Sequence, residues 1–170
     1  VDLHTFPAEL FSQLPKLEMI DMFGVNLKKI KDYTFTNATE LIQLHLIDND
    51  LEEITAYTFF GARKLFNLVL HSCKISKISS NAFDTCTSLE YLNLANNNIS
   101  SIDPDLFAPL KNLTIVHMYK SKLLSLSPKT FFYNKKLKIL DFETNSIKGE
   151  ITLEFDSVNL HHLDLSLIHI

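Results

Sequence analysis

Glycine is scarce in this chain, with three residues among 170, at positions 24, 61 and 149. Glycines so far apart cannot form a G-x-x-x-x-G-K phosphate loop or a G-x-G-x-x-G dinucleotide motif. The motifs H-E-x-x-H, C-x-x-C and G-x-S-x-G are also missing from the sequence. We therefore expect no nucleotide chemistry, no cofactor and no enzyme activity. Because glycine adopts positive φ most readily, its scarcity also predicts few backbone positions of that kind.

Cysteine, long apolar runs and strong net charge are also lacking. Two cysteines, Cys73 and Cys86, do not decide the redox compartment, and the sequence leaves open whether they are bonded. The longest apolar runs, such as 68–70, are too short to cross a membrane, so we expect no membrane insertion in this segment. A net charge of -4 gives no broad basic surface, and we therefore expect no binding to nucleic acid.

Phenylalanine, in contrast, is abundant and regularly spaced. Thirteen are present, and seven of them follow one another at intervals of 24 residues. Leucines keep the same period, and each opens the pattern L-x-x-L-x-L-x-x-N-x-L, which is clearest at 89–99. The phenylalanines are Phe11, Phe35, Phe59, Phe83, Phe107, Phe131 and Phe155, and the leucines are Leu17, Leu41, Leu65, Leu89, Leu113, Leu137 and, after 23 residues, Leu160.

This pattern resembles the leucine-rich repeat, in the 24-residue form common in extracellular proteins, and the resemblance covers the whole chain. It implies an α/β repeat solenoid, a curved horseshoe with a parallel β-sheet on the concave face and loops or short helical turns on the convex face. We expect a single domain over 1–170, with about seven repeats starting near 17, 41, 65, 89, 113, 137 and 160 and a partial repeat at 1–16. The chain would then be a fragment of a longer array.

Each unit has a predictable interior, counted from its opening leucine as position one. Positions four and six point inward from a short strand, and the phenylalanines form a spine along the convex side. Position nine normally holds asparagine, which satisfies backbone groups in the turn, but Val25 and Ile168 cannot do so and predict altered turns there. At Cys73 we expect a buried, unreactive thiol. Position nine is filled in chain order by Val1, Val25, Asn49, Cys73, Asn97, Ser121, Asn145 and Ile168.

Positions three, five and seven of each unit should project from the concave sheet, because alternate residues of a strand face opposite ways. Many of these residues are aromatic or aliphatic, and exposed apolar groups of this kind mark interaction sites. The alternative is that they only pack the surface of the sheet. The candidate partner-binding residues are Phe23, Ile47, Val69, His71, Tyr91, Ile115, His117, Tyr119, Ile139 and Asp141.

Acidic and histidine residues also gather on this face. His117, Asp141 and Asp164 fall on adjacent rungs at position five, about 4.8 Å apart. Such a group could bind a divalent cation or act as a pH switch. We favour a hydrated polar patch and expect no metal site.

Glycosylation and the ends of the solenoid provide further expectations. The sequons at Asn37, Asn98 and Asn112 would be surface acceptors in a secreted protein. Apolar residues at both ends look uncovered, which allows self-association as an alternative to a longer array. These end residues are Phe6, Phe11, Ile168 and Ile170.

The resemblance extends to Toll-type receptor ectodomains and insect leucine-rich-repeat immune proteins. It implies a protein-binding recognition module with a protein partner, acting in innate immunity or cell-surface signalling. The expected location is extracellular or secreted, including the ectodomain of a membrane receptor. Two alternatives stay open: a structural spacer or assembly segment of a larger ectodomain, and a receptor for a lipid or glycan ligand.

Overall fold

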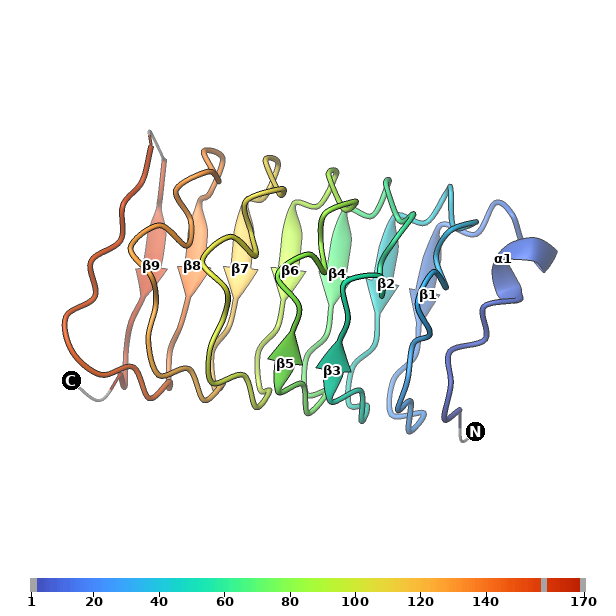
Figure 1. The fold of residues 1–170 in the computed structure, drawn as a ribbon, viewed down its shortest axis with the longest axis horizontal. Coiled ribbons are helices and arrows are strands. Elements are labelled where there is room, and N and C mark those ends of the chain that lie inside the picture. The colour runs from blue at the N-terminus through green and yellow to red at the C-terminus, as the bar shows by residue number, and fades with distance from the viewer. Residues whose placement is uncertain (1–2, 157–158, 169–170) are drawn as a thin grey trace.

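One sheet of seven short parallel strands runs the length of the molecule (Figure 1). The computed structural model describes residues 3–156 and 159–168. Every strand begins at position three of a predicted unit, and neighbours pair in the register that the repeat requires. The strands are β1 (Met19–Asp21), β2 (Gln43–His45), β4 (Asn67–Val69), β6 (Tyr91–Asn93), β7 (Ile115–His117), β8 (Ile139–Asp141) and β9 (His162–Asp164). The predicted leucine-rich-repeat solenoid is confirmed.

Turns make up most of the opposite side of the solenoid. Two short strands, β3 (Glu53–Ile54) and β5 (Lys77–Ile78), pair there in parallel. In place of the expected short helical turns there are four-residue hydrogen-bonded turns, such as the one closed by Phe60 N–H donating to the Tyr57 carbonyl at 3.2 Å. Within the described ranges the only α-helix is α1 (Leu10–Gln13), which lies at the N-terminal end (Figure 1).

The core repeats with the period of the sequence. In β2, β4, β6, β7 and β8 the middle residue is buried while its two neighbours are half-buried, as alternation on a sheet requires. Phenylalanine rings line the other wall, with Phe35 and Phe59 5.8 Å apart and Phe107 and Phe131 5.1 Å apart. A fully buried side chain of this size contributes about 1.5–3 kcal/mol, but only neighbouring units can bury it.

Position nine, from Asn49 to Asn145, forms a ladder of side-chain hydrogen bonds that joins a unit to the one before it. Asn97 is buried, accepts the backbone N–H groups of Cys73 (3.0 Å) and Ile75 (2.9 Å), and donates to the Leu70 carbonyl at 2.8 Å. Cys73 itself reaches the equivalent carbonyl of Leu46 at 2.6 Å through its Sγ. The ladder explains why asparagine recurs here: it is the short side chain that both donates and accepts.

Both cysteines are buried and free. Burial raises the pKa of Cys73 to about 12, and burial likewise raises the pKa of Cys86 to about 12. The thiolate is the reactive form, so both groups are inert near neutral pH. The sequence-based expectation for Cys73 is confirmed.

The expectation of few positive-φ residues is wrong. Ten described non-glycine residues have positive φ, and position eight adopts φ between 51° and 60° in every unit. The reason is a second backbone ladder, in which the N–H of position eight donates to the carbonyl of position seven in the next unit, as from Asn96 to Tyr119 at 2.8 Å. The residues at position eight are Gly24, Asp48, Ser72, Asn96, Lys120, Thr144 and Leu167.

The turn at Val25 is altered as expected. Asn26, which follows Val25, has φ 56°, whereas Asp50 and Asn98, which follow the ladder asparagines, do not have positive φ. Lys74, after Cys73, shares the altered conformation with φ 58°. The turn that follows Ile168 lies outside the described residues, as do Val1 and Ile170.

Phe6 and Phe11, at the N-terminal end, are not uncovered, contrary to the sequence-based expectation. Phe6 and Phe11 are each 3% exposed. Their rings stack on each other at 6.1 Å, and both contact Phe35, at 5.1 and 5.5 Å. Backbone bonds also tie this segment to the first full unit, such as Phe6 N–H to the Lys29 carbonyl at 2.9 Å. These two rings therefore offer no apolar surface to self-association, while Ile168 is partly buried against the core.

Candidate recognition face

The outer surface of the seven-stranded sheet, here called the sheet face, consists of positions three, five and seven of the units. The strands place positions three and five on this surface, and position seven continues it into the turn. All ten candidate binding residues occupy these positions. The structure therefore puts them on one face, but it divides them into two groups of different character.

The C-terminal group, here called the aromatic–histidine cluster, is His71, Tyr91, His117 and Tyr119. The ring of His117 lies 5.6 Å from Tyr91 and 6.1 Å from Tyr119. His71 reaches Tyr119 at 6.0 Å although a whole unit separates them. The unit between them has Ala95 at position seven, and this residue is fully buried. A small residue on the middle rung lets the rings on either side meet above it.

Beside the cluster, the aliphatic residues Ile115 and Ile139 pair with Tyr91 in register across β6, β7 and β8. They extend the apolar surface of the cluster toward the C-terminal rungs. Each is half-buried, so part of each side chain remains accessible to a partner.

Asp141 fixes the position of His117. Its carboxylate lies 3.2 Å from the Nδ1 of His117, and its other oxygen accepts the Glu143 backbone N–H at 3.2 Å. Burial, and then the negative charge of Asp141, raise the pKa of Tyr119. The phenol therefore stays neutral and available as a hydrogen-bond donor at physiological pH.

The acidic group on this face differs from the predicted trio. Carboxylate oxygens of Asp141, Glu143 and Asp164 lie within 4.8 Å of one another. Of these three residues, Asp141 is the one that pairs with His117. Sequence reasoning missed Glu143 because it is at position seven, diagonal to the position-five row. Hydrogen bonds from Ser166 lower the pKa of Asp164, so its carboxylate is held ionised by its own turn.

The N-terminal group, which consists of Phe23, Ile47 and Val69, has no such network of ring contacts. Phe23 is 69% exposed and has no ring contact with another described aromatic residue, and Ile47 and Val69 are half-buried. His45 contacts Asp21 at 2.7 Å through Nδ1, in an exposed pair that sequence reasoning did not single out. The common signal for both histidine–carboxylate pairs is the 24-residue separation at position five.

Three polar atoms in the middle of the sheet face are buried without a hydrogen-bond partner in the protein. They are Nε2 of His45, Oδ1 of Asn67 and Nδ1 of His71. Buried polar atoms are nearly always paired, so these three are exceptions within the fold, and their burial keeps them out of direct reach of a partner on this face. His71 belongs to the aromatic–histidine cluster, whereas His45 lies on β2 and Asn67 on β4.

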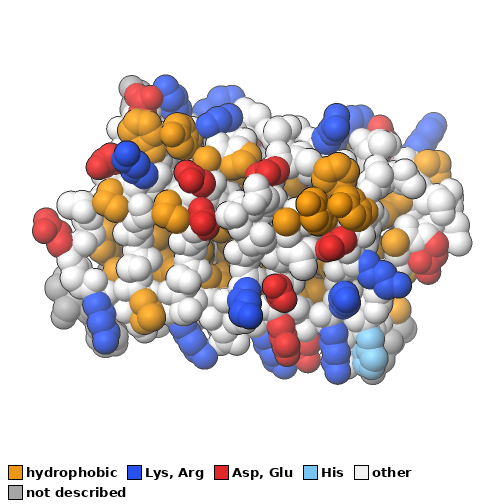
Figure 2. Space-filling model, viewed as in Figure 1, with side chains coloured by type: hydrophobic (Ala, Val, Ile, Leu, Met, Phe, Trp, Pro, Cys, Tyr) orange, Lys and Arg blue, Asp and Glu red, His pale blue; other side chains and the backbone are white. Residues whose placement is uncertain are grey.

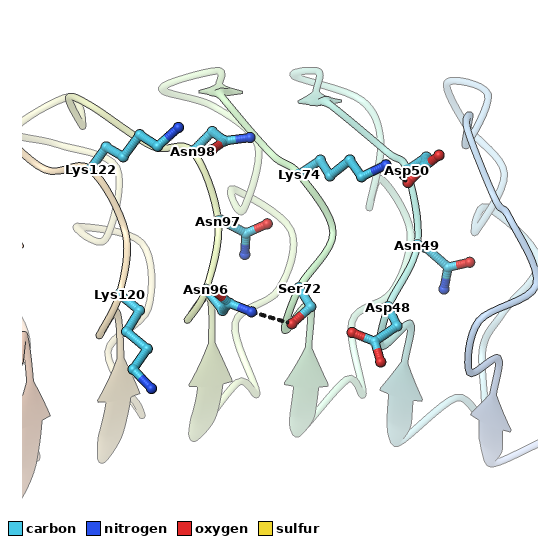
Figure 3. Close-up of a pocket in the computed structure, with 10 residues that line it drawn as sticks. All are labelled: Asp48, Asn49, Asp50, Ser72, Lys74, Asn96, Asn97, Asn98, Lys120 and Lys122. Atoms are coloured by element: carbon cyan, nitrogen blue, oxygen red, sulfur yellow. Dashed lines mark hydrogen bonds and ion pairs between the residues drawn. The ribbon is translucent and has the colours of Figure 1, made fainter. Parts of the chain in front are cut away.

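A polar groove of about 460 Å³ borders the sheet face at the carboxyl ends of β2, β4, β6 and β7 (Figure 3). Lys74 pairs there with Asp50 at 2.6 Å, and Asn96 donates to Ser72 at 2.7 Å. No ion pair involves Lys120 among the described residues. The lining residues are Asp48, Asn49, Asp50, Ser72, Lys74, Asn96, Asn97, Asn98, Lys120 and Lys122.

The three sequon asparagines differ in their surroundings. Asn37 and Asn98 are exposed, and neither side chain makes a hydrogen bond in the described part of the chain. Asn112 is half-buried, donates to the Thr87 carbonyl at 2.9 Å and accepts from Lys136 at 2.8 Å. No helix within the described residues is long and apolar enough to span a membrane.

Several solved structures share this fold. The chain superposes on Toll in its complex with Spatzle, from Drosophila, with a TM-score of 0.82 and 24% identity, covering 97% of this chain and 22% of that chain. For TLR13 in its complex with ssRNA13 the TM-score is 0.74 and the identity 25%, over 88% of this chain and 24% of that chain. For the APL1 leucine-rich-repeat domain the values are 0.76 and 19%, over 95% and 48%.

The chain thus spans less than a quarter of the Toll and TLR13 chains. No curated protein sequence matches it. The repeat family described as "BspA type Leucine rich repeat region" matches residues 4–138 in six copies. With the leucine spacing, the parallel sheet and this match together, the chain belongs to the BspA-type leucine-rich-repeat family.

Proposed function

We propose that this chain is a protein-binding recognition module that acts outside the cell, in innate immunity or cell-surface signalling, and that its sheet face contacts the partner. The proposal treats residues 1–170 as one domain. The observation that carries it is the aromatic–histidine cluster, because the repeat does not require aromatic residues at these positions. In the other units the same rows hold residues such as Asp21, Gln43 and Ser166.

Contacts within the cluster suit it to recognition. Its rings are half-buried, so they keep accessible area while their neighbours restrict their rotamers. Side chains that are already ordered lose less conformational entropy on binding. Tyrosine is also enriched among the residues that dominate interface energies. Tyr91 and Tyr119 are therefore the proposed anchors, with Ile115 and Ile139 as the apolar surface beside them.

Charge favours a protein partner over a nucleic acid. The carboxylates of Asp141, Glu143 and Asp164 lie together beside the cluster, where they would repel phosphates. The Toll structure contains the protein Spatzle, whereas the TLR13 structure contains ssRNA. A polypeptide with basic and apolar side chains is the better complement to the face of this chain.

Affinity capture from extracellular fluid of the source organism tests the proposal. The wild-type chain is compared with Tyr91→Ser/Tyr119→Ser and with Tyr133→Ser, an exposed tyrosine on the turn side that serves as the matched control. Circular dichroism establishes that all three are folded. We expect one protein to be retained by the wild type and the control and lost by the double variant. Equal retention by all three proteins would contradict recognition by the sheet face.

The same capture separates the alternatives. A spacer segment would retain no protein with any variant. A lipid or glycan receptor would carry its ligand through purification as additional mass that mass spectrometry detects. Either result would contradict protein recognition by the sheet face.

A further inference from the structure

Three exposed aromatic rings cluster on the turn side, away from the sheet face. Tyr33, Tyr57 and Phe60 are 51%, 46% and 38% exposed. Tyr33 stacks on Tyr57 at 4.9 Å and meets Phe60 edge-on at 5.3 Å. Hydrophobic side chains gather right of centre on the face that Figure 2 shows. This convex aromatic cluster is separate from the aromatic–histidine cluster of the sheet.

The repeat does not require these rings. Tyr33 and Tyr57 occupy position seventeen, where the next two units have Asn81 and Asp105. Tyr33 also has φ 62°, which is an unfavourable conformation for a bulky residue. Exposed rings that contribute little to the core, one of them on a strained backbone, indicate a surface that something covers.

A sequon begins four residues after Tyr33. Asn37 and Thr39 are exposed, and Asn37 makes no side-chain hydrogen bond in the described part of the chain. The turn that carries Asn37 is pressed against the turn that carries Phe60. A Cβ built on Gly61 would lie 2.6 Å from the Thr36 Cα, so the backbones touch there. Since neighbouring Cα atoms are about 3.8 Å apart, Asn37 and Phe60 each begin one residue from that contact.

We propose that Asn37 carries an N-linked glycan whose first sugar residues lie across the convex aromatic cluster. One face of a pyranose ring presents C–H groups, which pack on an aromatic face and remove both from water, while the hydroxyls remain in solvent. The glycan is the only occupant that the chain itself tethers beside the rings. The inference rests on the extracellular location in the proposed function, but not on recognition by the sheet face.

The other sequons supply internal controls. Asn98 lies in the polar groove among lysine and asparagine side chains, where no aromatic residue lines the wall (Figure 3). A glycan there would have no ring to pack on. At Asn112 the amide nitrogen is turned to the Thr87 carbonyl, and its oxygen accepts from Lys136. A stabilising effect of glycosylation should therefore be specific to Asn37.

A double-mutant cycle tests the inference on the chain secreted from eukaryotic cells. Mass spectrometry first measures occupancy of each sequon. Thermal unfolding then compares Asn37→Gln with wild type, and repeats the comparison in a Tyr33→Ser/Tyr57→Ser/Phe60→Ser background. We expect occupancy at Asn37, a melting temperature about 2–4 °C lower without the glycan, and no such difference in the ring-deleted background. Asn98→Gln should shift the melting temperature by less than about 1 °C.

Two results would overturn the inference. One is an unmodified Asn37 in the secreted, folded chain. The other is the same effect of Asn37→Gln with and without the rings, because the glycan would then act without touching them. Partner capture with Tyr91→Ser/Tyr119→Ser is measured on the same secreted protein. Its outcome does not depend on Asn37, so failure of the recognition proposal and failure of this inference can be told apart.

Discussion

The two halves of the sheet face have the same backbone but differently organised side chains. On the N-terminal rungs, Phe23 projects into solvent without contact to another described ring. On the C-terminal rungs, His117 contacts both Tyr91 and Tyr119, and Tyr119 meets His71 above a buried Ala95. The difference shows that apolar side chains on one repeated backbone are held in place only where neighbouring residues contact them.

The ladder below the sheet does not follow the same division. Beneath the N-terminal half, Asn49 accepts the Leu27 N–H at 2.9 Å and donates to the Met22 carbonyl at 2.8 Å. Beneath the C-terminal half, Asn97 makes the corresponding bonds, whereas Ser121 makes one bond of 3.4 Å. We therefore attribute the order of the aromatic–histidine cluster to contacts among its own side chains.

The largest expected effect comes from removing the ladder. Asn97→Ala would leave the N–H groups of Cys73 and Ile75 and the Leu70 carbonyl without this partner, so we expect a loss of about 3–5 kcal/mol in the free energy of unfolding. Ser121→Ala, which removes one 3.4 Å bond to the Leu94 carbonyl, should cost about 1 kcal/mol or less. Urea denaturation measures both. Equal losses of unfolding free energy from Asn97→Ala and Ser121→Ala would show that stability does not depend on how many hydrogen bonds the position-nine side chain makes.

The second-largest expected effect is on the affinity for the partner, and it differs between the two halves of the sheet face. Tyr91→Ser/Tyr119→Ser removes two ordered anchors, and we expect it to weaken partner binding by about 2–4 kcal/mol. Phe23→Ser removes a ring that must become ordered on binding, so the expected loss is below about 1 kcal/mol. Titration calorimetry with the captured partner measures both values. A larger loss from Phe23→Ser would reverse the comparison.

Alkaline pH should lower the free energy of unfolding, because the two buried thiols resist ionisation in the folded chain. Burial raises the pKa of Cys73 and Cys86 from 9.0 to about 12, so between these values the folded chain holds protons that the unfolded chain has lost. The free energy of unfolding should therefore fall as pH rises above about 9, by about 1.4 kcal/mol per pH unit for each thiol. Denaturation from pH 8 to 11, with Cys73→Ala/Cys86→Ala as the control, measures this slope. An equal slope in the control would assign the effect to other groups.

The smallest expected effect on the free energy of unfolding comes from Thr144, a residue with positive φ beside the aromatic–histidine cluster. Thr144 is β-branched and has φ 57°, which is costly for this side chain. Thr144→Asn should raise the free energy of unfolding by about 0.5–1 kcal/mol, because asparagine tolerates this conformation better. Asn96→Gly, at the same position, should change it by only a few tenths of a kcal/mol. Destabilisation by Thr144→Asn would mean that the threonine side chain contributes more than its backbone costs.

Sequence reasoning was most successful where one requirement recurs in every unit. The inward positions, the phenylalanine wall and the strand register all follow from burying apolar side chains between stacked turns. The period also placed the ten candidate residues on the outer positions of the sheet, because side-chain direction alternates along a strand.

Contacts that join different units were harder to predict. The scarcity of glycine pointed away from positive φ, but the position-eight ladder holds Asn96 and Lys120 in that conformation regardless of residue type. The burial of Phe6 and Phe11 depends on packing by the partial repeat, for which the pattern gives no template. The contact between His71 and Tyr119 depends on the small side chain of Ala95, whose effect appears only when three rungs are placed together.

Hydrogen–deuterium exchange of the chain with and without its captured protein partner tests the central claim most directly. If the aromatic–histidine cluster is the anchor, bound partner should slow exchange at 91–95, 115–119 and 139–143, with the N-terminal rungs less protected and the turn side unchanged. Protection confined to the turn side, to the polar groove or to the ends of the solenoid would contradict recognition by the sheet face.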